Sequence, residues 1–368
     1  MLRFFVTVFV TLAFGTVLAQ TPARSAPPSQ PAPTESATRP SFAEWLDTVR
    51  SEAVARGIRQ EVVDEALASV AEPMPVVLRR DRTQAEAVLS IERYLSRQLT
   101  PTRIREGRAR LAAHEAILNK VAETYGVPAP IIGGIWGMES NFGRFTGVRP
   151  TIAALATLAW DPRRASYFRS ELFNALQIVN RGDIDLPELK GSWAGAMGQP
   201  QFMPSSYLQF AEDFDGDGRR DIWNTPDDVF ASIANYLKGH GWTPGQSWGR
   251  EVSVSKIAVS HIAGTVARRA GSCQATRDMT VALPVAEWEA LGVRTMAGGA
   301  LPKNGPEGAL VSGRTRHFLV YANYDALLQY NCAHAYALSV ALLGDRLAAT
   351  PSTPARPAAS RPTKPRRH

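Results

Sequence analysis

Cysteine and histidine are both scarce in this chain of 368 residues, which contains two cysteines and six histidines. The cysteines, Cys273 and Cys332, lie far apart and form no CxxC pair, which argues against a zinc site even with His334 nearby. No Ser-His-Asp order or P-loop stands out, and we expect His240 and His317 to be core or surface residues rather than catalysts.

Long hydrophobic runs are absent after the first twenty residues, so no later segment could cross a membrane. The chain opens with Met-Leu-Arg, continues with an apolar run from Phe4 to Leu18, and then offers a small-residue cleavage pattern at Val17-Leu-Ala19. This pattern predicts a signal peptide over residues 1–19, and the lack of a nearby cysteine excludes lipid attachment there. We therefore expect an exported, periplasmic and soluble protein, with an uncleaved anchor as the less favoured alternative.

Export bears on the two cysteines, because an even pair in an oxidising compartment favours one disulfide. The alternative is two separate buried thiols. The net charge of +7 favours anionic partners, although much of the excess lies in the last thirteen residues. No nucleic-acid module is recognisable, so an acidic cell-wall polymer or an anionic membrane surface is the better expectation, and we expect a monomer.

Composition divides the chain into a folded region between two biased segments. Residues 20–40 and 349–368 are rich in Pro, Ser, Thr and Ala, which predicts a disordered linker and a disordered basic tail. The folded region is 41–348, and it contains no internal repeat. Its fold class is predicted to be α+β, mainly α, with a compact β insertion at about 245–325.

Periodicity places the elements within that region. A capping box at Ser41-Phe-Ala-Glu44 opens the first helix. Apolar spacing predicts further helices over 60–70, 85–99, 101–125, 129–140, 151–158, 163–179, 227–240 and 331–347. Alternating or apolar β-forming runs predict strands at 251–259, 280–283 and 317–321.

One carboxylate, Glu139, lies among apolar residues near the end of the helix expected over 129–140. Asn141 and Gly143 follow it as helix-stop residues. A carboxylic acid in a partly dry site tends to keep its proton, because desolvation disfavours the charge, and it can then act as a general acid. The alternative, that Glu139 is a solvated residue at a helix end, is equally compatible with this window alone.

The second motif is the long stretch from Gly191 to Tyr207. Its small residues allow close backbone approach, of the kind that a sugar chain in a cleft requires. Polar and aromatic side chains there could contact hydroxyl groups, acetamido groups and sugar rings: Ser192, Gln199, Gln201, Trp193, Phe202 and Tyr207. A glycine-rich helix junction over an aromatic core is the alternative, which composition alone favours.

Taken together, three motifs resemble the membrane-bound-lytic-transglycosylase-B family, the peptidoglycan lytic transglycosylases of glycoside hydrolase family 103. They are Glu139-Ser-Asn-Phe-Gly143, the Ser192–Tyr207 stretch, and Ser232-Ile-Ala-Asn-Tyr-Leu237 followed by His240-Gly-Trp242. The resemblance spans about 41–347 and implies a lysozyme-like core, an additional helical domain and a small β domain. It implies no cofactor for the chemistry.

The resemblance also assigns site residues. The family's catalytic acid falls on Glu139, and its cleft serine and glutamine fall on Ser192 and Gln201. The remaining substrate-binding positions implied by the resemblance are Tyr94, Tyr236, Tyr330, Asn331 and Tyr336.

The mechanism implied by the resemblance needs one carboxylate where ordinary glycosidases need two. Asp161, Asp183 and Asp185 lie in turn-like segments and are expected to be solvated. Glu139 would cleave the β-1,4 bond after N-acetylmuramic acid on peptidoglycan glycan strands and form 1,6-anhydromuramyl ends, as a carbon–oxygen lyase. The alternatives are a hydrolytic muramidase on the same scaffold and a non-catalytic peptidoglycan-binding protein.

An acidic loop, Asp213 to Asn224, matches the start of an EF-hand, with acids at positions 1, 3 and 5 and glycine at position 6. Asn224 replaces the usual glutamate at position 12, and the family resemblance implies closure by Asp228 instead. The predicted structural Ca²⁺ ligands are Asp213, Asp215, Asp217, Arg219 and Asp228. An acidic turn without metal is the alternative.

Overall fold

The computed structural model describes residues 40–83 and 89–349. The predicted signal peptide, the linker up to residue 39, the start of the helix expected over 85–99 and the tail from residue 350 lie outside the described residues. Within the described ranges, no helix combines the length and the hydrophobicity that a bilayer crossing requires.

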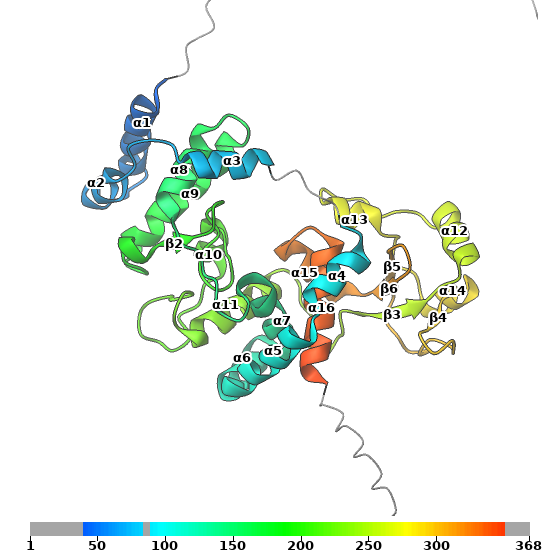
Figure 1. Ribbon diagram of the computed structural model, residues 1–368. Coiled ribbons are helices and arrows are strands. Elements are labelled where there is room, and N and C mark those ends of the chain that lie inside the picture. The colour runs from blue at the N-terminus through cyan, green and yellow to red at the C-terminus, as the bar shows by residue number, and fades with distance from the viewer. Residues whose placement is uncertain (1–39, 84–88, 350–368) are drawn as a thin grey trace, which may run out of the picture. The chain divides into compact units, whose positions relative to one another are not determined.

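The described residues are mainly helical, which confirms the predicted fold class (Figure 1). The helices of the first half are α1 (Phe42–Ala55), α2 (Gln60–Ala68), α3 (Pro75–Thr83), α4 (Ile91–Gln98), α5 (Pro101–Ala113), α6 (Glu115–Tyr125), α7 (Ala129–Ser140), α8 (Thr151–Trp160) and α9 (Ala165–Arg181). Those of the second half are α10 (Pro204–Phe210), α11 (Pro226–Gly239), α12 (Lys256–Thr265), α13 (Gln274–Asp278), α14 (Val285–Ala290), α15 (Ala322–Tyr330) and α16 (His334–Ala348).

Local signals explain several of these boundaries. Ser41 and Glu44 form the predicted capping box, with Glu44 N–H donating to Ser41 Oγ at 3.3 Å and Ser41 N–H donating to Glu44 Oε2 at 2.7 Å. The single helix predicted over 101–125 is wrong, because the chain breaks at His114 into α5 and α6. The His114 ring packs edge-on against Trp136 and Phe230, so the break between the two helices lies against the core.

The predicted strand over 251–259 is only half correct. Strand β3 (Gly249–Ser253) ends early, and Ser255 then caps α12 by accepting a hydrogen bond from Ala258 N–H at 3.1 Å. A good N-cap thus outweighs the alternation of β-branched residues that follows it. The predicted strand at 280–283 forms only isolated bridges, Arg268 with Thr280 and Leu283 with Gly308.

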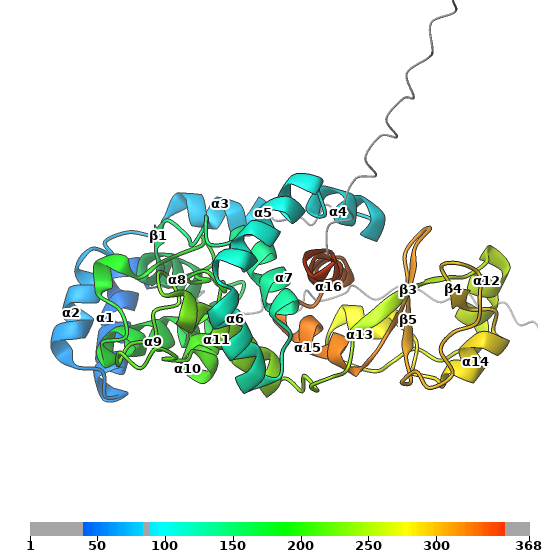
Figure 2. The same cartoon turned by 90° about the horizontal axis from the view of Figure 1, so that it is seen from below.

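The predicted strand at 317–321 is confirmed as β6 (His317–Val320), the second strand of an antiparallel pair with β3. The four-stranded sheet has the order β4-β3-β6-β5, with β4 at Arg294–Thr295 and β5 at Ala309–Ser312. Side chains alternate between two cores: Phe318 packs into the large helical cluster, whereas Leu319 packs into a separate cluster with α12 and α14. Figure 2 shows these two helices beside the sheet.

The helix that carries Glu139, α7, is buried on nearly every side and packs closely along α16 (Figures 1 and 2). Two glycines permit this close approach. A Cβ on Gly134 would lie 2.5 Å from the carbonyl oxygen of Val340, and a Cβ on Gly344 would lie 3.0 Å from Ile131. The sequence thus fixes the distance between two helices whose side chains meet at the candidate site.

Candidate active site

The candidate site begins where α7 ends. Asn141, Phe142 and Gly143 all have left-handed backbone conformations, with φ of 51°, 58° and 81°. Ser140 Oγ closes this turn by donating to the carbonyl oxygen of Trp136 at 3.1 Å and accepting from Gly143 N–H at 3.0 Å. Consecutive left-handed residues are strained, and such strain concentrates at functional sites. Glu139, the residue before Ser140, thus lies directly beside this strained turn.

Gln199 joins this turn to the second motif. Its Oε1 accepts a hydrogen bond from Trp136 Nε1 at 2.6 Å, and its Nε2 donates to the carbonyl oxygen of Trp223 at 2.8 Å. A Cβ on Gly143 would lie 2.6 Å from Gln199 Oε1, so only glycine fits there. Both polar groups of Gln199 are occupied, so its role is to connect the motifs rather than to contact a ligand freely.

The Glu139 carboxyl group is enclosed by protein, although the residue keeps some contact with solvent. Tyr336 on α16 donates its hydroxyl hydrogen to Glu139 Oε1 at 2.5 Å. Burial raises the pKa of Glu139 to about 7, and the hydrogen bond from Tyr336 partly opposes that rise. At neutral pH a substantial fraction of Glu139 is therefore protonated and able to donate a proton.

Three tyrosines surround this carboxyl group. Burial raises the pKa of Tyr94, Tyr330 and Tyr336, and in each case the charge of Glu139 is the next largest cause. The structure thus brings these predicted site residues, from α4, α15 and α16, close to one carboxylate. Tyr94, on the least distinctive of the predicted motifs, is half-buried at the edge of the group.

Tyr236 continues the aromatic group away from Glu139. Its ring lies 4.7 Å from that of Tyr330, which in turn stacks at 6.4 Å on Tyr336. The Tyr236 hydroxyl donates to the carbonyl oxygen of Gln329, and the Tyr330 hydroxyl donates to that of Pro200, both at 2.8 Å. These bonds hold the two rings in their orientations. The bond to Pro200 also connects the second motif with Tyr330, which lies near Glu139.

Gln201 and Ser192 lie on either side of the glycine-rich turn of that motif. Gln201 follows Pro200 and is the third non-glycine residue with positive φ in the described part of the chain, at 54°. Ser192 Oγ accepts from Ala194 N–H at 3.3 Å and from Ala196 N–H at 3.1 Å, which leaves its own hydrogen free to donate. Both side chains are half-buried and can reach a ligand.

The prediction that Phe202 and Tyr207 offer open ring faces is wrong. Phe202 is 2 % exposed and packs against Tyr236 and Tyr330, while Tyr207 is fully buried and donates to the carbonyl oxygen of Arg220. Both belong to the core beneath the motif. By contrast, Asn331 is exposed between Tyr330 and α16; its backbone N–H donates to the carbonyl oxygen of Leu327, but its side-chain amide makes no hydrogen bond with another described residue.

Within the described ranges, no second carboxylate contributes to the pKa of Glu139. Asp161 is not solvated as predicted; it is buried and accepts from Arg163 N–H at 3.1 Å. Asp185 pairs with Arg219 at 3.1 Å. Burial raises the pKa of Asp183, where the positive charges of nearby arginines partly oppose it. The site therefore contains a single acid in a desolvated position.

The acidic loop gathers Asp213, Asp215 and Asp217, whose ligand oxygens lie within 4.8 Å of one another. Asp228 lies beneath this cluster and accepts from Phe214 N–H at 2.7 Å and from Asp221 N–H at 2.8 Å. Burial raises the pKa of Asp228 to about 6, and the charges of Asp215 and Asp213 add to the rise.

Hard oxygen ligands in this arrangement suit a calcium ion, which would relieve the mutual repulsion of the carboxylates. Arg219 lies at the seventh position of the loop, where the backbone carbonyl is the usual ligand, and its guanidinium instead pairs with Asp185.

Cys273 and Cys332 form a disulfide with a sequence separation of 59, the pairing that the sequence favours. Cys332 directly follows Asn331, so the bond ties the segment between Tyr330 and Tyr336 to the start of α13.

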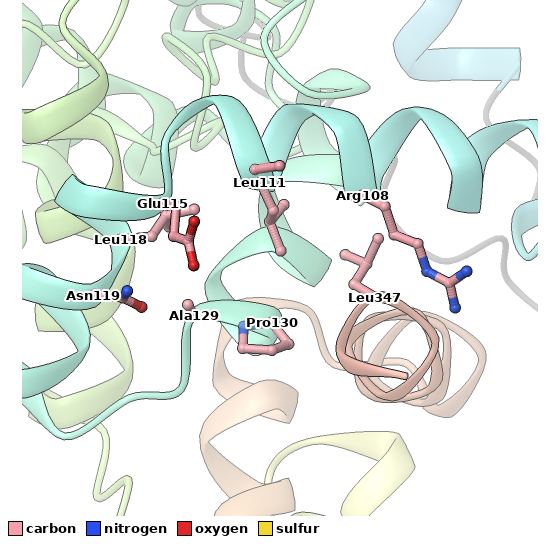
Figure 3. A pocket seen from close by; sticks show the side chains of 9 residues that line it. Arg108, Leu111, Glu115, Leu118, Asn119, Ala129, Pro130 and Leu347 are labelled. Carbon is pink, nitrogen blue, oxygen red and sulfur yellow. The ribbon is translucent and has the colours of Figure 1, made fainter. Parts of the chain in front are cut away.

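A separate cavity of about 330 Å³ lies between α5, α6, the start of α7 and the end of α16 (Figure 3). It contains none of the predicted site residues, and its carboxylate, Glu115, is exposed. We therefore place the candidate site at Glu139, on its chemistry rather than on cavity size.

The mainly helical fold, with the desolvated acid Glu139 at the candidate site, agrees with a lysozyme-like class of protein. The family described as Transglycosylase SLT domain matches residues 41–345, and the chain belongs to this family.

A curated relative also matches part of the chain. The chain is 46% identical over 154 residues to membrane-bound lytic murein transglycosylase B of Escherichia coli (strain K12). That alignment covers 42% of each protein, so it spans less than half of the curated relative's length.

Solved structures extend the similarity. SltB3 from Pseudomonas aeruginosa, in complex with NAG-anhNAM-pentapeptide, is 42% identical with a TM-score of 0.76, over 83% of this chain and 79% of that one. The Escherichia coli lytic transglycosylase Slt35, in complex with calcium, is 31% identical with a TM-score of 0.68, over 85% of this chain and 94% of that one.

Proposed function

We propose that this protein is an exported, periplasmic peptidoglycan lytic transglycosylase. It cleaves the β-1,4 bond between N-acetylmuramic acid and N-acetylglucosamine and leaves 1,6-anhydromuramyl ends. The observation that carries the proposal is the pairing of Glu139, whose pKa is raised to about 7, with Tyr336 at 2.5 Å and no second carboxylate in its described surroundings. SltB3, with its NAG-NAM-pentapeptide complex, supports the choice of substrate.

In this mechanism Glu139 acts first as an acid and then as a base. The protonated carboxyl group donates its hydrogen to the glycosidic oxygen as the bond to muramyl C1 breaks. The resulting carboxylate takes the hydrogen of the muramyl C6 hydroxyl, whose oxygen bonds to C1. Glu139 is thereby reprotonated, and no water is consumed. The Tyr336 hydrogen bond stabilises the intermediate carboxylate and for that reason lowers the pKa of Glu139.

The surrounding residues hold the glycan strand in place. Ser192, Gln201 and Asn331 offer side-chain groups that are not fully spent within the protein, and they orient the acetamido groups of the substrate. The partly exposed tyrosines, Tyr94 and Tyr330, contact sugar rings, and Tyr236 supports Tyr330 from behind.

Asp213, Asp215, Asp217 and the carbonyl of Arg219 would hold a structural calcium ion in the acidic loop. Asp228 would close the site from below. The calcium complex of the relative Slt35 supports the choice of ion. The ion would brace the loop between α10 and α11 and would take no part in the reaction.

The test is the substitution Glu139→Gln, which keeps an oxygen for the Tyr336 hydrogen bond but cannot supply the proton. We expect no fragment release from purified sacculi and unchanged sacculus binding, with Glu115→Gln, at an exposed carboxylate, as the control variant. Retained turnover in Glu139→Gln would refute the proposal. Normal binding without turnover in the unmodified protein would instead favour a non-catalytic peptidoglycan-binding protein.

A further inference from the structure

Two large apolar side chains are exposed on a short loop directly after the Glu139 turn. We call residues 144–148 the Phe145 loop. Phe145 is 68% exposed and Val148 is 84% exposed. Single exposed apolar residues are ordinary on protein surfaces. Two of them lie on one five-residue loop next to a candidate active site, which makes this loop a candidate for a binding surface.

The backbone of this loop is held in place. Phe145 N–H donates to the carbonyl oxygen of Ser140 at 2.9 Å, and Arg144 pairs with Glu106 of α5 at 2.6 Å. Gly147, with φ of 100°, packs so closely that a Cβ there would lie 2.2 Å from the carbonyl carbon of Gly191. The exposure of Phe145 is therefore a property of an anchored loop.

The Phe145 loop connects the turn after Glu139 with the strand that leads to the second motif. It begins five residues after Glu139 and leads into strand β1 (Arg149–Pro150), which pairs with β2 (Lys190–Gly191). Arg149 lies opposite Gly191, and the next residue is Ser192. The carbonyl oxygen of Thr146 also lies 3.5 Å from Gln201 Nε2, a weak contact with the second motif. The loop therefore lies beside Gln201 and the strand that leads to Ser192, and it follows Glu139 closely in the chain.

We propose that Phe145 and Val148 form an apolar platform for the peptidoglycan glycan strand, beyond the sugars whose bond is cleaved. The apolar face of a sugar ring stacks on the Phe145 ring, and Val148 extends that surface. The inference rests on the proposed function, since it names a further contact for the same substrate. The platform contributes to strand binding and leaves the chemistry at Glu139 unchanged.

The test measures binding of purified uncrosslinked glycan strands in the Glu139→Gln background, where cleavage does not interfere. We expect Phe145→Ala to weaken binding about tenfold and Phe145→Trp to restore it. Ile257→Ala removes an apolar side chain on α12 that is 84% exposed, more than Phe145, and serves as the control, with no expected change. Melting temperatures should not move, because the Phe145 side chain is mostly in solvent.

Kinetics of the cleaving protein complete the test. Phe145→Ala should raise KM for strands about tenfold and leave kcat within about twofold, as loss of uniform binding does. Unchanged binding and KM, with fragments still released, would overturn the platform and leave the proposed function standing. Weaker binding by Phe145→Ala, in a protein that never released anhydromuramyl fragments, would support the platform and refute the proposed function. Unchanged strand binding, with Phe145→Ala altering only self-association or binding to anionic lipid vesicles, would also overturn the platform.

Discussion

Glu139→Gln is expected to stabilise the protein at alkaline pH as well as to abolish turnover. Burial raises the pKa of Glu139 from an ordinary 4.5 to about 7. Between these values the folded protein holds a proton that the unfolded chain releases, so the free energy of unfolding falls as pH rises through this window. Glutamine carries no charge, so the variant lacks this fall in the free energy of unfolding.

The magnitude follows from the size of the pKa rise. One pKa unit corresponds to about 1.4 kcal/mol, so ionising Glu139 inside the folded protein costs about 3 kcal/mol. Part of that cost is already present at about pH 5, which leaves a change of about 2.5 kcal/mol between about pH 5 and about pH 8. Some solvent reaches the residue, so about 2 kcal/mol is the more realistic expectation.

The assay is urea unfolding of the unmodified protein and Glu139→Gln at both pH values. Other titrating groups are common to the two proteins and cancel in the difference. The variant's advantage should grow by about 2 kcal/mol toward the higher pH, with Glu115→Gln controlling for the loss of one negative charge. A difference between the two proteins that stays constant with pH would refute the argument that Glu139 is held in a desolvated site.

Three further predictions concern Tyr336, the acidic loop and the disulfide. Tyr336→Phe removes the hydrogen bond that lowers the pKa of Glu139, so the alkaline limb of the pH–rate profile should move to higher pH; a shift to lower pH would contradict this. Asp213→Asn should abolish the rise in melting temperature that Ca²⁺ gives to chelator-treated protein, and calorimetry showing neither binding nor a rise would exclude the metal site. Reduction of the Cys273–Cys332 bond, which closes a loop of separation 59, should lower stability by up to about 4 kcal/mol, whereas a Cys273→Ser/Cys332→Ser double variant should be insensitive to reductant in thermal unfolding.

The sequence predicts much of the helical framework because capping residues and apolar spacing act locally. The box at Ser41 and the stop at Asn141 both lie where the sequence puts them. It fails where tertiary contacts decide, as at His114, whose packing on Trp136 breaks one expected helix into two. The strand expected over 251–259 fails for the opposite reason, since a local cap at Ser255 prevails over β propensity.

Composition also leaves the direction of side chains undetermined. Phe202, Tyr207 and Gln201 share one motif, yet the first two lie in the core and only Gln201 is accessible. The positioning role of Gln199 follows from its contacts with Gly143 and Trp136. Both residues lie far from Gln199 in the sequence and meet it only in the fold. The exposure of Phe145 is likewise visible only once Gly147 and Gly191 are seen in contact.

The most direct test of the central claim is mass spectrometry of the fragments that residues 20–368 release from purified sacculi. With Glu139 as the single acid and base, the muramyl ends should carry the 1,6-anhydro ring, and Glu139→Gln should release none. Reducing muramyl ends would contradict the account, because they require water as the nucleophile and a second group to activate it.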